Sequence, residues 1–287
     1  MEELAVLGGF ANHVSMAQTG LPTTTAGELA SMVFAKCCAH ARSIGAIVSQ
    51  SSMFDHHAVM ALARMIMEAS TMISYLNDPV GTDEWELRHT VLRLHDTATR
   101  IKLLRGFGGS ADDLRAGREE LKAKLLSLPL FAALPEQRRA RILTGEEMFT
   151  TGMRGVAIKK MGWDEDQFTA IYAYLSAHAH SAPVSFMRMR EHQIDYMAPS
   201  ETQMETLAIS MQVAISCLRR VLVRQIDLQP DQVGEYQPDL LAEARTEDAA
   251  CPFFNRRPVS ISRQPDAGAP IPPAVPIDLG RVTGKQP

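Results

Sequence analysis

The stretch DHHAVMALARMIMEASTMISYLNDP, Asp55 to Pro79, decides the fold class. It is apolar on almost every face when the residues are set at helical spacing, which is typical of a helix buried in the centre of a bundle. Proline disfavours helical geometry at the residue before it, so the helix should stop at Asp78-Pro79. We therefore expect a central helix from Asp55 to Asn77.

The segments on either side of this stretch also follow the helical period. Period-two alternation with β-branched residues is absent, so we expect almost no sheet. The sequence predicts an all-α fold, a single helical bundle of about six to eight helices with a disordered C-terminal tail. Besides the central helix, the expected helices span residues 25–50, 82–105, 111–128, 135–143, 155–161, 164–180 and 199–228.

Composition divides the chain into a bundle and two flanking parts. Residues 1–24 should be a partly helical lead segment, and residues 25–228 should form the helical-bundle domain. Ten of the 16 prolines follow residue 229. Such a segment has too little apolar surface for a core, so we expect a loosely attached connection over 229–247 and a disordered Pro-rich tail over 248–287. Within the tail, PFFNRRP is either a short docking motif or an ordinary apolar patch.

Charge and cysteine content weigh against several classes of protein. A net charge of −4 over 287 residues provides no global basic field for nucleic acid or an acidic membrane. The first residues, MEELAVLGGFANHV, carry acidic groups where a signal peptide carries Lys or Arg. We find no apolar run near the roughly 20 residues that span a bilayer. Because no run is that long, we expect no membrane partner. The four cysteines form no CxxC pair, so we expect a reduced, cytoplasmic setting.

A narrow polar line runs along the otherwise apolar central helix. His57, Arg64, Glu68 and Tyr75 follow one another at spacings that keep them within an arc of roughly 40°. Burying such groups is costly unless they pair. One interpretation is a structural i,i+4 ion pair between Arg64 and Glu68. The other is a functional pocket, with His57 and Tyr75 as weaker members.

A second polar face lies on the expected helix over 164–180. Thr169, Tyr172, Ser176 and His180 fall on one side of that helix. His178 and His180 point about 200° apart, so they cannot close on one metal, and we expect no metal site and no cofactor. Ser176 lacks the small-residue turn of a nucleophile elbow, which argues against hydrolase chemistry.

One loose motif match bears on RNA cleavage. The nucleases of the higher-eukaryote-and-prokaryote nucleotide-binding superfamily are helical bundles that use Arg-x(4–6)-His, and Arg88-x6-His95 fits that spacing. A match this loose is common by chance, and a solvated helix face explains it better. Arg188, Arg190 and His192 form a second basic cluster where phosphate could lie.

With these residues in view, the sequence resembles a family of uncharacterised, mostly bacterial helical proteins that is known as a domain of unknown function. The resemblance covers roughly residues 30–225 and lies in two blocks, ARMIMEASTMISYLNDP and GMRGVAIKKMGWDEDQFTAIYAYLSAHAHSAP. It implies a single α-helical domain and no established activity, and a link to the nucleotide-binding superfamily is fold-level analogy. The family's signature positions correspond to Arg64, Glu68, Tyr174, Ser176 and His180.

The two polar faces suggest one shared cluster. We expect the two helices to pack together, with Glu68 accepting a hydrogen bond from His180 or Ser176 and with Arg64 held by Glu68. The function that follows is an interaction or regulatory module whose tail docks a protein partner. The alternative is a nucleotide- or RNA-binding protein, including a metal-independent ribonuclease.

Overall fold

The computed structural model describes residues 2–49, 54–249 and 253–254, and these residues build an all-α fold. The absence of sheet is confirmed for this part of the chain, where pairing of β type is limited to an isolated bridge between Trp163 and Phe254. The helix number exceeds the expected six to eight, because several connections coil into short helices. The α-helices are α1 Glu2–Ala17, α2 Thr25–Ser49, α3 His56–Asn77, α4 Thr82–Gly106, α5 Asp112–Ser127, α6 Pro129–Ala132, α7 Glu136–Thr144, α8 Gly152–Val156, α9 Glu165–Ala179, α10 Pro183–Met187, α11 Glu201–Leu228 and α12 Pro238–Ala249, with a π-helical turn η1 Ala157–Met161 and a 3-10 turn η2 Pro230–Glu235.

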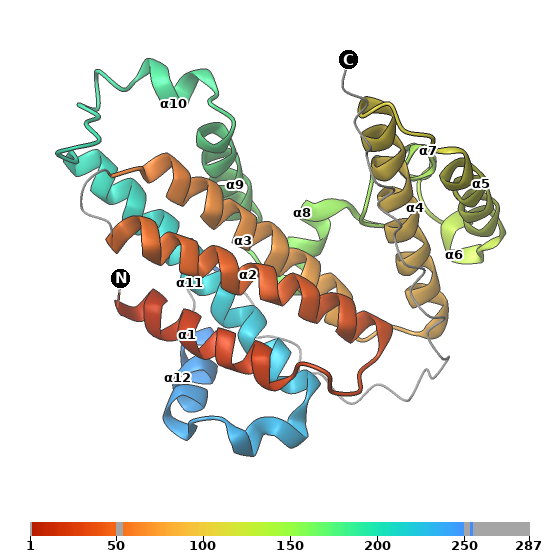
Figure 1. Cartoon of the computed structure of the whole chain (residues 1–287), viewed down its shortest axis with the longest axis horizontal. Coiled ribbons are helices and arrows are strands. Elements are labelled where there is room, and N and C mark those ends of the chain that lie inside the picture. Colours follow the sequence, from red (N-terminus) through yellow and green to blue (C-terminus); the bar gives the residue numbers. More distant parts are fainter. Residues whose placement is uncertain (1, 50–53, 250–252, 255–287) are drawn as a thin grey trace, which may run out of the picture.

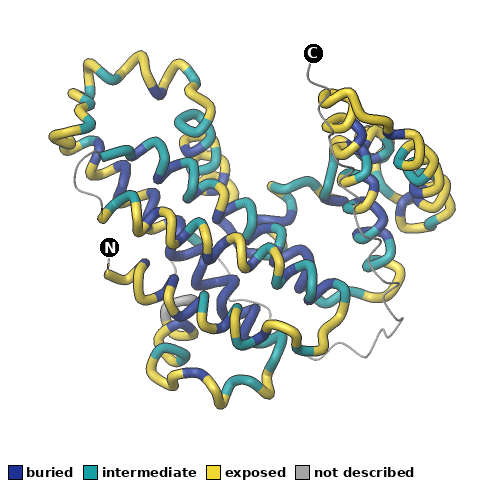
Figure 2. Tube along the Cα trace, viewed as in Figure 1, coloured by how far each residue is buried: buried dark blue, intermediate teal, exposed yellow. Residues whose placement is uncertain are grey.

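Helix α3 is the central helix of the larger of two lobes, as its sequence predicts (Figure 1). It packs against α2, α9 and α11, and α1 covers α2 and α11. The buried residues of α3 and α11 run through the middle of this lobe (Figure 2). Burying large aliphatic side chains from each helix contributes about 1.5–3 kcal/mol per residue, which is the main source of its stability.

The ends of α3 lie where the local sequence places them. The Asp55 side chain accepts a hydrogen bond from the Ala58 amide at 3.0 Å, so one of the free N–H groups of the first turn is satisfied. Asp78 leaves the helix in an extended conformation immediately before Pro79. These two ends position the first turn of α3, and with it His56 and His57.

The smaller lobe consists of α4 to α7 and has its own apolar core (Figure 1). A third, small cluster of Tyr75, Phe149 and Val156 joins the two lobes. The core of the smaller lobe comprises Leu87, Val91, Leu94, Leu121, Leu125, Phe131 and Ile142.

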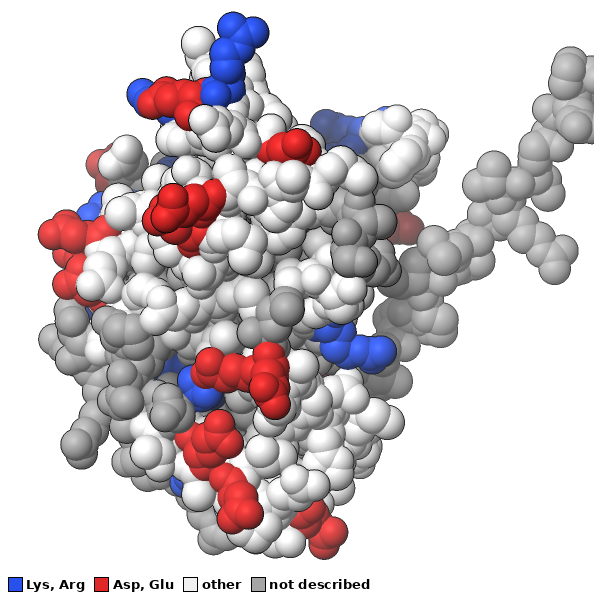
Figure 3. Space-filling view, turned by 90° about the vertical axis from the view of Figure 1, so that its left-hand side faces the viewer, with Lys and Arg blue, Asp and Glu red and all other residues white. Residues whose placement is uncertain are grey.

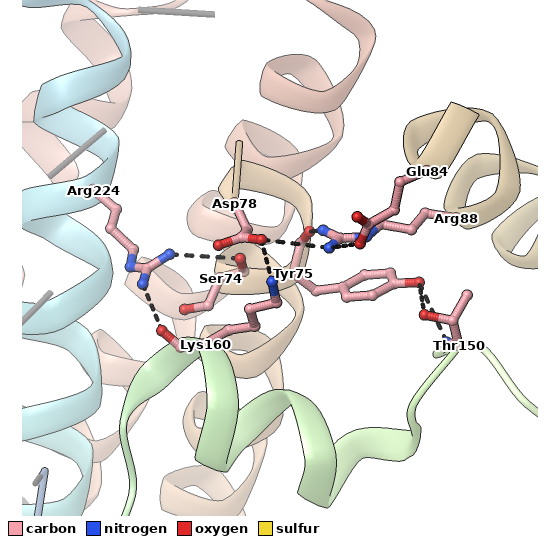
Figure 4. Close-up of polar contacts among 8 residues, drawn as sticks. All are labelled: Ser74, Tyr75, Asp78, Glu84, Arg88, Thr150, Lys160 and Arg224. Atoms are coloured by element: carbon pink, nitrogen blue, oxygen red, sulfur yellow. Dashed lines mark hydrogen bonds and ion pairs between the residues drawn. The ribbon is translucent and has the colours of Figure 1, made fainter. Parts of the chain in front are cut away.

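A buried polar network, the interlobe network, also joins the lobes at the C-terminal end of α3 (Figure 4). Arg88 donates to the Tyr75 carbonyl at 2.6 Å and pairs with Glu84 and, at 3.4 Å, with Asp78. Lys160 reaches the same Asp78 carboxylate at 2.5 Å. Arg88 is 1% exposed, so the expectation of a solvated helix face is wrong here. Arginines are favoured at this end because they compensate the negative end of the helix dipole.

The flanking parts are more closely attached than their composition suggests. Helix α1 contributes Leu4, Phe10 and Val14 to the main core, so residues 1–24 are more than a lead segment. On the other side, η2 and α12 return along α11, and Tyr236 and Ala244 are buried in the same core. Residues 248–249 of the expected tail belong to α12, and Phe253 and Phe254 pack on Trp163. The rest of the expected disordered tail and its protein-docking role lie outside the described residues.

Two helices are long and apolar enough to cross a bilayer by length and composition, namely α3 and α11. This differs from the expectation that no apolar run approaches that length. The most apolar window of α3 is 61% buried and that of α11 is 78% buried against other helices. Packing in the core therefore accounts for their apolarity. Cys37, Cys38 and Cys217 are buried, and a reduced, cytoplasmic setting stays a prediction.

Candidate functional site

Helices α3 and α9 meet along a row of polar side chains, which we call the α3–α9 seam and define by His56, His57, Arg64 and Glu68 of α3 and by Tyr172, His178 and His180 of α9. The expectation that the two polar faces lie against each other is confirmed. Arg64 and His180 come within 2.7 Å, well inside the hydrogen-bonding range.

The central part of the seam is a four-residue network around Arg64. One guanidinium nitrogen donates to His180 Nε2 at 2.7 Å. The other donates to the Tyr172 hydroxyl at 3.0 Å and pairs with Glu68 at 2.8 Å. The Tyr172 hydroxyl in turn donates to Glu68 at 2.9 Å. His180 is exposed, so the network has one end in solvent and the other against the helices.

The pairing inside this network differs from the expected one. Glu68 accepts from Tyr172, and His180 is bound by Arg64. The Ser176 hydroxyl donates to the Tyr172 carbonyl of its own helix at 2.6 Å. Serine is too short to cross from one helix to the other, whereas the tyrosine hydroxyl extends over the gap. Ser176 therefore has no role in the seam.

Other predicted members of the two polar faces lie elsewhere. The Tyr174 hydroxyl bonds Thr206 of α11 at 3.0 Å, and its ring lies edge-on to His178. Tyr75 is buried and its hydroxyl contacts Thr150 at 3.2 Å. This part of α3 lies beyond its contact with α9 and packs against the segment before α8. The Thr169 hydroxyl bonds a carbonyl of its own helix.

Three histidines come together at the end of the seam that lies at the start of α3. His57 Nδ1 and His178 Nδ1 are 3.0 Å apart, and one ligand nitrogen from each of His56, His57 and His178 lies within 4.8 Å of the others. The prediction that His178 and His180 diverge is correct, since they contact different residues. What it missed is that α3 supplies two partners for His178. The adjacent pair His56-His57 at the start of a core helix is the sequence feature that could have indicated this cluster.

The environment of these three rings keeps them uncharged at neutral pH. Burial lowers the pKa of His56 to about 4, with further lowering by His57 and His178 against an opposing effect of Asp55. Burial and then His57 lower the pKa of His178 to about 4. Burial also lowers the pKa of His57, again against Asp55. Neutral imidazole is the form that binds metal ions.

The loose nuclease motif does not form a joint site. Arg88 is enclosed in the interlobe network, while a ring nitrogen of His95 lies 2.9 Å from the Gly145 carbonyl in the smaller lobe. Because Arg88 is buried and paired, it cannot meet a phosphate group without breaking that network.

The second basic cluster lies on a segment that leaves the bundle between α9 and α11, which we call the arch and define as residues 181–200 (Figure 1). Arg188 pairs with Glu191 at 2.9 Å, so its charge is partly neutralised. The face of the molecule that Figure 3 shows has charged groups of both signs scattered among uncharged atoms and no continuous basic area. Large apolar side chains are exposed on the arch, namely Val184, Phe186, Met187 and Met197.

A surface cavity of about 560 Å³ lies apart from the seam, between α7, α8 and the start of α9. Its three arginines are already paired. Arg138 and Arg141 both bind Glu147, at 3.0 and 2.9 Å, and Arg154 binds Glu165 at 2.6 Å. The lining nevertheless keeps an excess of positive charge, because two arginines share Glu147 and Lys159 lies at the same cavity.

Comparison of the chain with protein-family models, with curated proteins and with solved structures found no match. The arguments for function consequently rest on the seam and the arch.

Proposed function

We propose that this protein is an interaction or regulatory module that binds a protein partner through the arch. The observation that carries the proposal is the exposure of four large apolar side chains on one short segment. Phe186 is 52% exposed, and Met187 and Met197 are each 74% exposed. Neighbouring exposed apolar groups of this size mark interaction surfaces.

The C-terminal part of the arch is held against the bundle, which limits the places where these side chains can lie. The Phe54 amide donates to the Tyr196 carbonyl at 2.7 Å. Gln203 of α11 binds the Asp195 backbone through both its amide oxygen and its amide nitrogen. A surface that is already ordered loses less conformational entropy when it binds.

Charge and side-chain type define the partner. Arg188 and Arg190 are offset by Glu191 and Asp195 on the same segment. This balance favours a protein with an uncharged apolar face over a nucleic acid. Unbranched methionine side chains adapt to such a face more readily than branched ones do.

Site-specific photo-crosslinking in cells tests the proposal. A photoreactive phenylalanine analogue replaces Phe186, and the control replaces Phe107, which is 87% exposed at the end of α4 in the other lobe. We expect one defined protein to be crosslinked from position 186 alone. Its affinity, measured with both proteins purified, should fall at least about tenfold with Met187→Asp. Absence of a crosslink from position 186, or identical crosslinks from both positions, would overturn the proposal.

The contact between Arg64 and His180 favours a second function, the binding of nucleotide or RNA phosphate at the seam. Arginine and histidine side by side at an exposed site can hold a phosphate group and donate or accept a proton beside it. Glu68 opposes an anion there, which is why this function ranks second.

Incubation of the purified protein with mixed RNA separates these two functions. If the seam cleaves RNA, cleavage should be lost with His180→Ala and kept with His95→Ala, at unchanged thermal stability. Loss with His95→Ala alone would instead point to the loose motif on α4. If the wild-type protein neither binds nor cleaves RNA, the second function is excluded and protein interaction is the proposed function that remains.

A further inference from the structure

The histidine cluster of His56, His57 and His178 is not used by either proposed function. His56 and His57 are the first two residues of α3, and His178 lies in the last turn of α9. Two helix ends thus bring three imidazoles together from positions more than 120 residues apart in the chain.

The distances within the cluster suit a single ion. Zinc binds imidazole nitrogen at about 2.0–2.1 Å, so two nitrogens of a tetrahedral site lie about 3.3 Å apart. His57 Nδ1 and His178 Nδ1 are 3.0 Å apart, and the ligand nitrogens of all three rings lie within 4.8 Å of one another. Small rotations of the rings bring this set to tetrahedral spacing.

The surroundings hold the first of these rings in place. His56 is 2% exposed, and the amide nitrogen of Gln203 lies 3.4 Å from its Nδ1. Gln203 is itself fully buried and is fixed by the capping box at the start of α11, where Ser200 and Gln203 bind each other's backbone amides. Because this amide nitrogen can only donate, Nδ1 of His56 is the acceptor in the contact, and binding a metal through Nε2 requires the ring proton to move to Nδ1 and the contact with Gln203 to open.

One aromatic ring lies beside each of the other two histidines, which are half-buried. The Tyr174 ring lies 4.9 Å from the His178 ring, and the Tyr196 ring lies 6.3 Å from the His57 ring. These rings limit the access of water, which strengthens the binding of an ion by neutral ligands.

We propose that His56, His57 and His178 bind one divalent transition-metal ion of the zinc class, with a fourth coordination position left to water or to a ligand. Imidazole nitrogens favour Zn²⁺, Co²⁺, Ni²⁺ and Cu²⁺ over Mg²⁺ and Ca²⁺. This site departs from the sequence-based expectation of no metal, which found that His178 and His180 diverge and that no third ligand lies nearby at a convincing spacing.

Binding of an ion at this position would link the last turn of α9 to the first turn of α3, next to the point where the arch begins. The proposal does not rest on the protein-interaction function, because the three ligands lie inside the bundle whether or not the arch has a partner.

Metal titration of the tag-free, chelator-treated full-length protein tests the site. Co²⁺ should bind at one ion per chain and give the strong visible absorption of a tetrahedral site, and Zn²⁺ should displace it. His178→Gln and His57→Gln should each weaken Zn²⁺ binding at least about 100-fold, since each removes a ligand and not merely an outer group. The matched control is His180→Ala, two residues away on the same helix, which should keep wild-type affinity.

A second measurement on the wild-type protein does not depend on whether these variants fold. Zn²⁺ should protect His57 and His178 from acylation by diethyl pyrocarbonate, read residue by residue by mass spectrometry, and should leave His180 unprotected. Failure of wild-type protein to bind Co²⁺ or Zn²⁺ stoichiometrically would overturn the proposal and would show that the histidines form only a hydrogen-bonded cluster. Equal binding by His178→Gln and wild type would overturn it as well.

Discussion

At the scale of single residues, Gly145 shows how tightly α7 is fastened to α4. It ends α7 with a φ of +81°, a conformation that costs other L-residues about 1–2 kcal/mol. A Cβ at this position would lie 2.4 Å from the Ala98 Cβ. Glycine is therefore needed here for two separate reasons, backbone conformation and space.

Gly145→Ala should lower the free energy of unfolding by about 3 kcal/mol, because the strain of the left-handed conformation adds to the clash with Ala98. Urea denaturation measures the change. Gly108 is the matched control, since its φ is +74° and nothing lies within 4 Å of the added Cβ. Gly108→Ala should cost only about 1 kcal/mol, and equal losses in both variants would contradict the close contact at Ala98.

The histidine cluster makes a prediction about pH. In the folded protein the pKa values of His56 and His178 are lowered to about 4, whereas unfolded histidine titrates near 6.5. Between these values the unfolded chain binds more protons than the folded one, so stability should be greatest above pH 6.5 and should fall as the pH drops toward 4. Of the facing groups, Asp55 opposes this effect, and burial raises the pKa of Tyr196, so its hydroxyl takes no part in the change over that range.

Thermal unfolding of the chelator-treated protein across this range measures the effect. His178→Gln should flatten the dependence on pH, because it removes one of the shifted groups and one of the influences that lower the pKa of His56. A wild-type melting temperature that stays constant from pH 7 to about 4.5 would contradict the neutral state of the cluster.

At the scale of helices, the seam is linked by one hydroxyl. The Tyr172 hydroxyl accepts from Arg64 and donates to Glu68, so Tyr172→Phe should remove two contacts between α9 and α3. We expect the free energy of unfolding to fall by about 1 kcal/mol. This is less than is usual for hydrogen bonds to charged groups, because Glu68 is partly exposed. Hydrogen exchange should show faster opening of α9.

The matched control for the hydroxyl is Ser176→Ala. Its hydroxyl binds only the Tyr172 carbonyl in the same helix, so the change should alter stability by less than about 0.5 kcal/mol. An equal effect of the two variants would show that Tyr172 does not link the helices.

The sequence predicts the helices better than it predicts their contacts. Local signals such as Asp55 and Asp78-Pro79 place the ends of α3 correctly, because caps and proline act within a few residues. The proline content after residue 229 predicts a loose segment, yet Pro238 begins α12, where its missing N–H has no cost. Proline content alone does not separate a helix start from a tail.

The candidate site could be predicted only in part for a similar reason. Helical spacing places Arg64 and Glu68 on one face, and the structure confirms it. The identity of their partners depends on how far α9 slides and turns against α3, which local sequence does not determine. A small shift along α9 exchanges Ser176 for Tyr172 and brings His178 to His57.

At the scale of the whole molecule, the two lobes are coupled through buried charge. Arg88 belongs to α4 of the smaller lobe, yet it binds the Tyr75 carbonyl and the Asp78 carboxylate of the larger one. Its ring contact with Tyr75, at 4.5 Å from the centroid, adds a cation–π interaction. A buried charge of this kind helps to specify how the two lobes are arranged. When it is removed, its partner carboxylate stays buried with less compensating charge, and this lowers the free energy of unfolding.

Arg88→Met should therefore lower the free energy of unfolding by about 3 kcal/mol, because the shape of the side chain is kept while the Asp78 carboxylate loses one of its two cations. Lys160 still neutralises Asp78, which limits the loss. The lobes should also become less coupled, so differential scanning calorimetry should resolve two transitions where wild type has one. Arg93→Met, an exposed change on the same helix, should stay within about 0.5 kcal/mol of wild type. If Arg88→Met unfolds in one transition at the wild-type temperature, the apolar cluster of Tyr75, Phe149 and Val156 alone is sufficient to hold the lobes together.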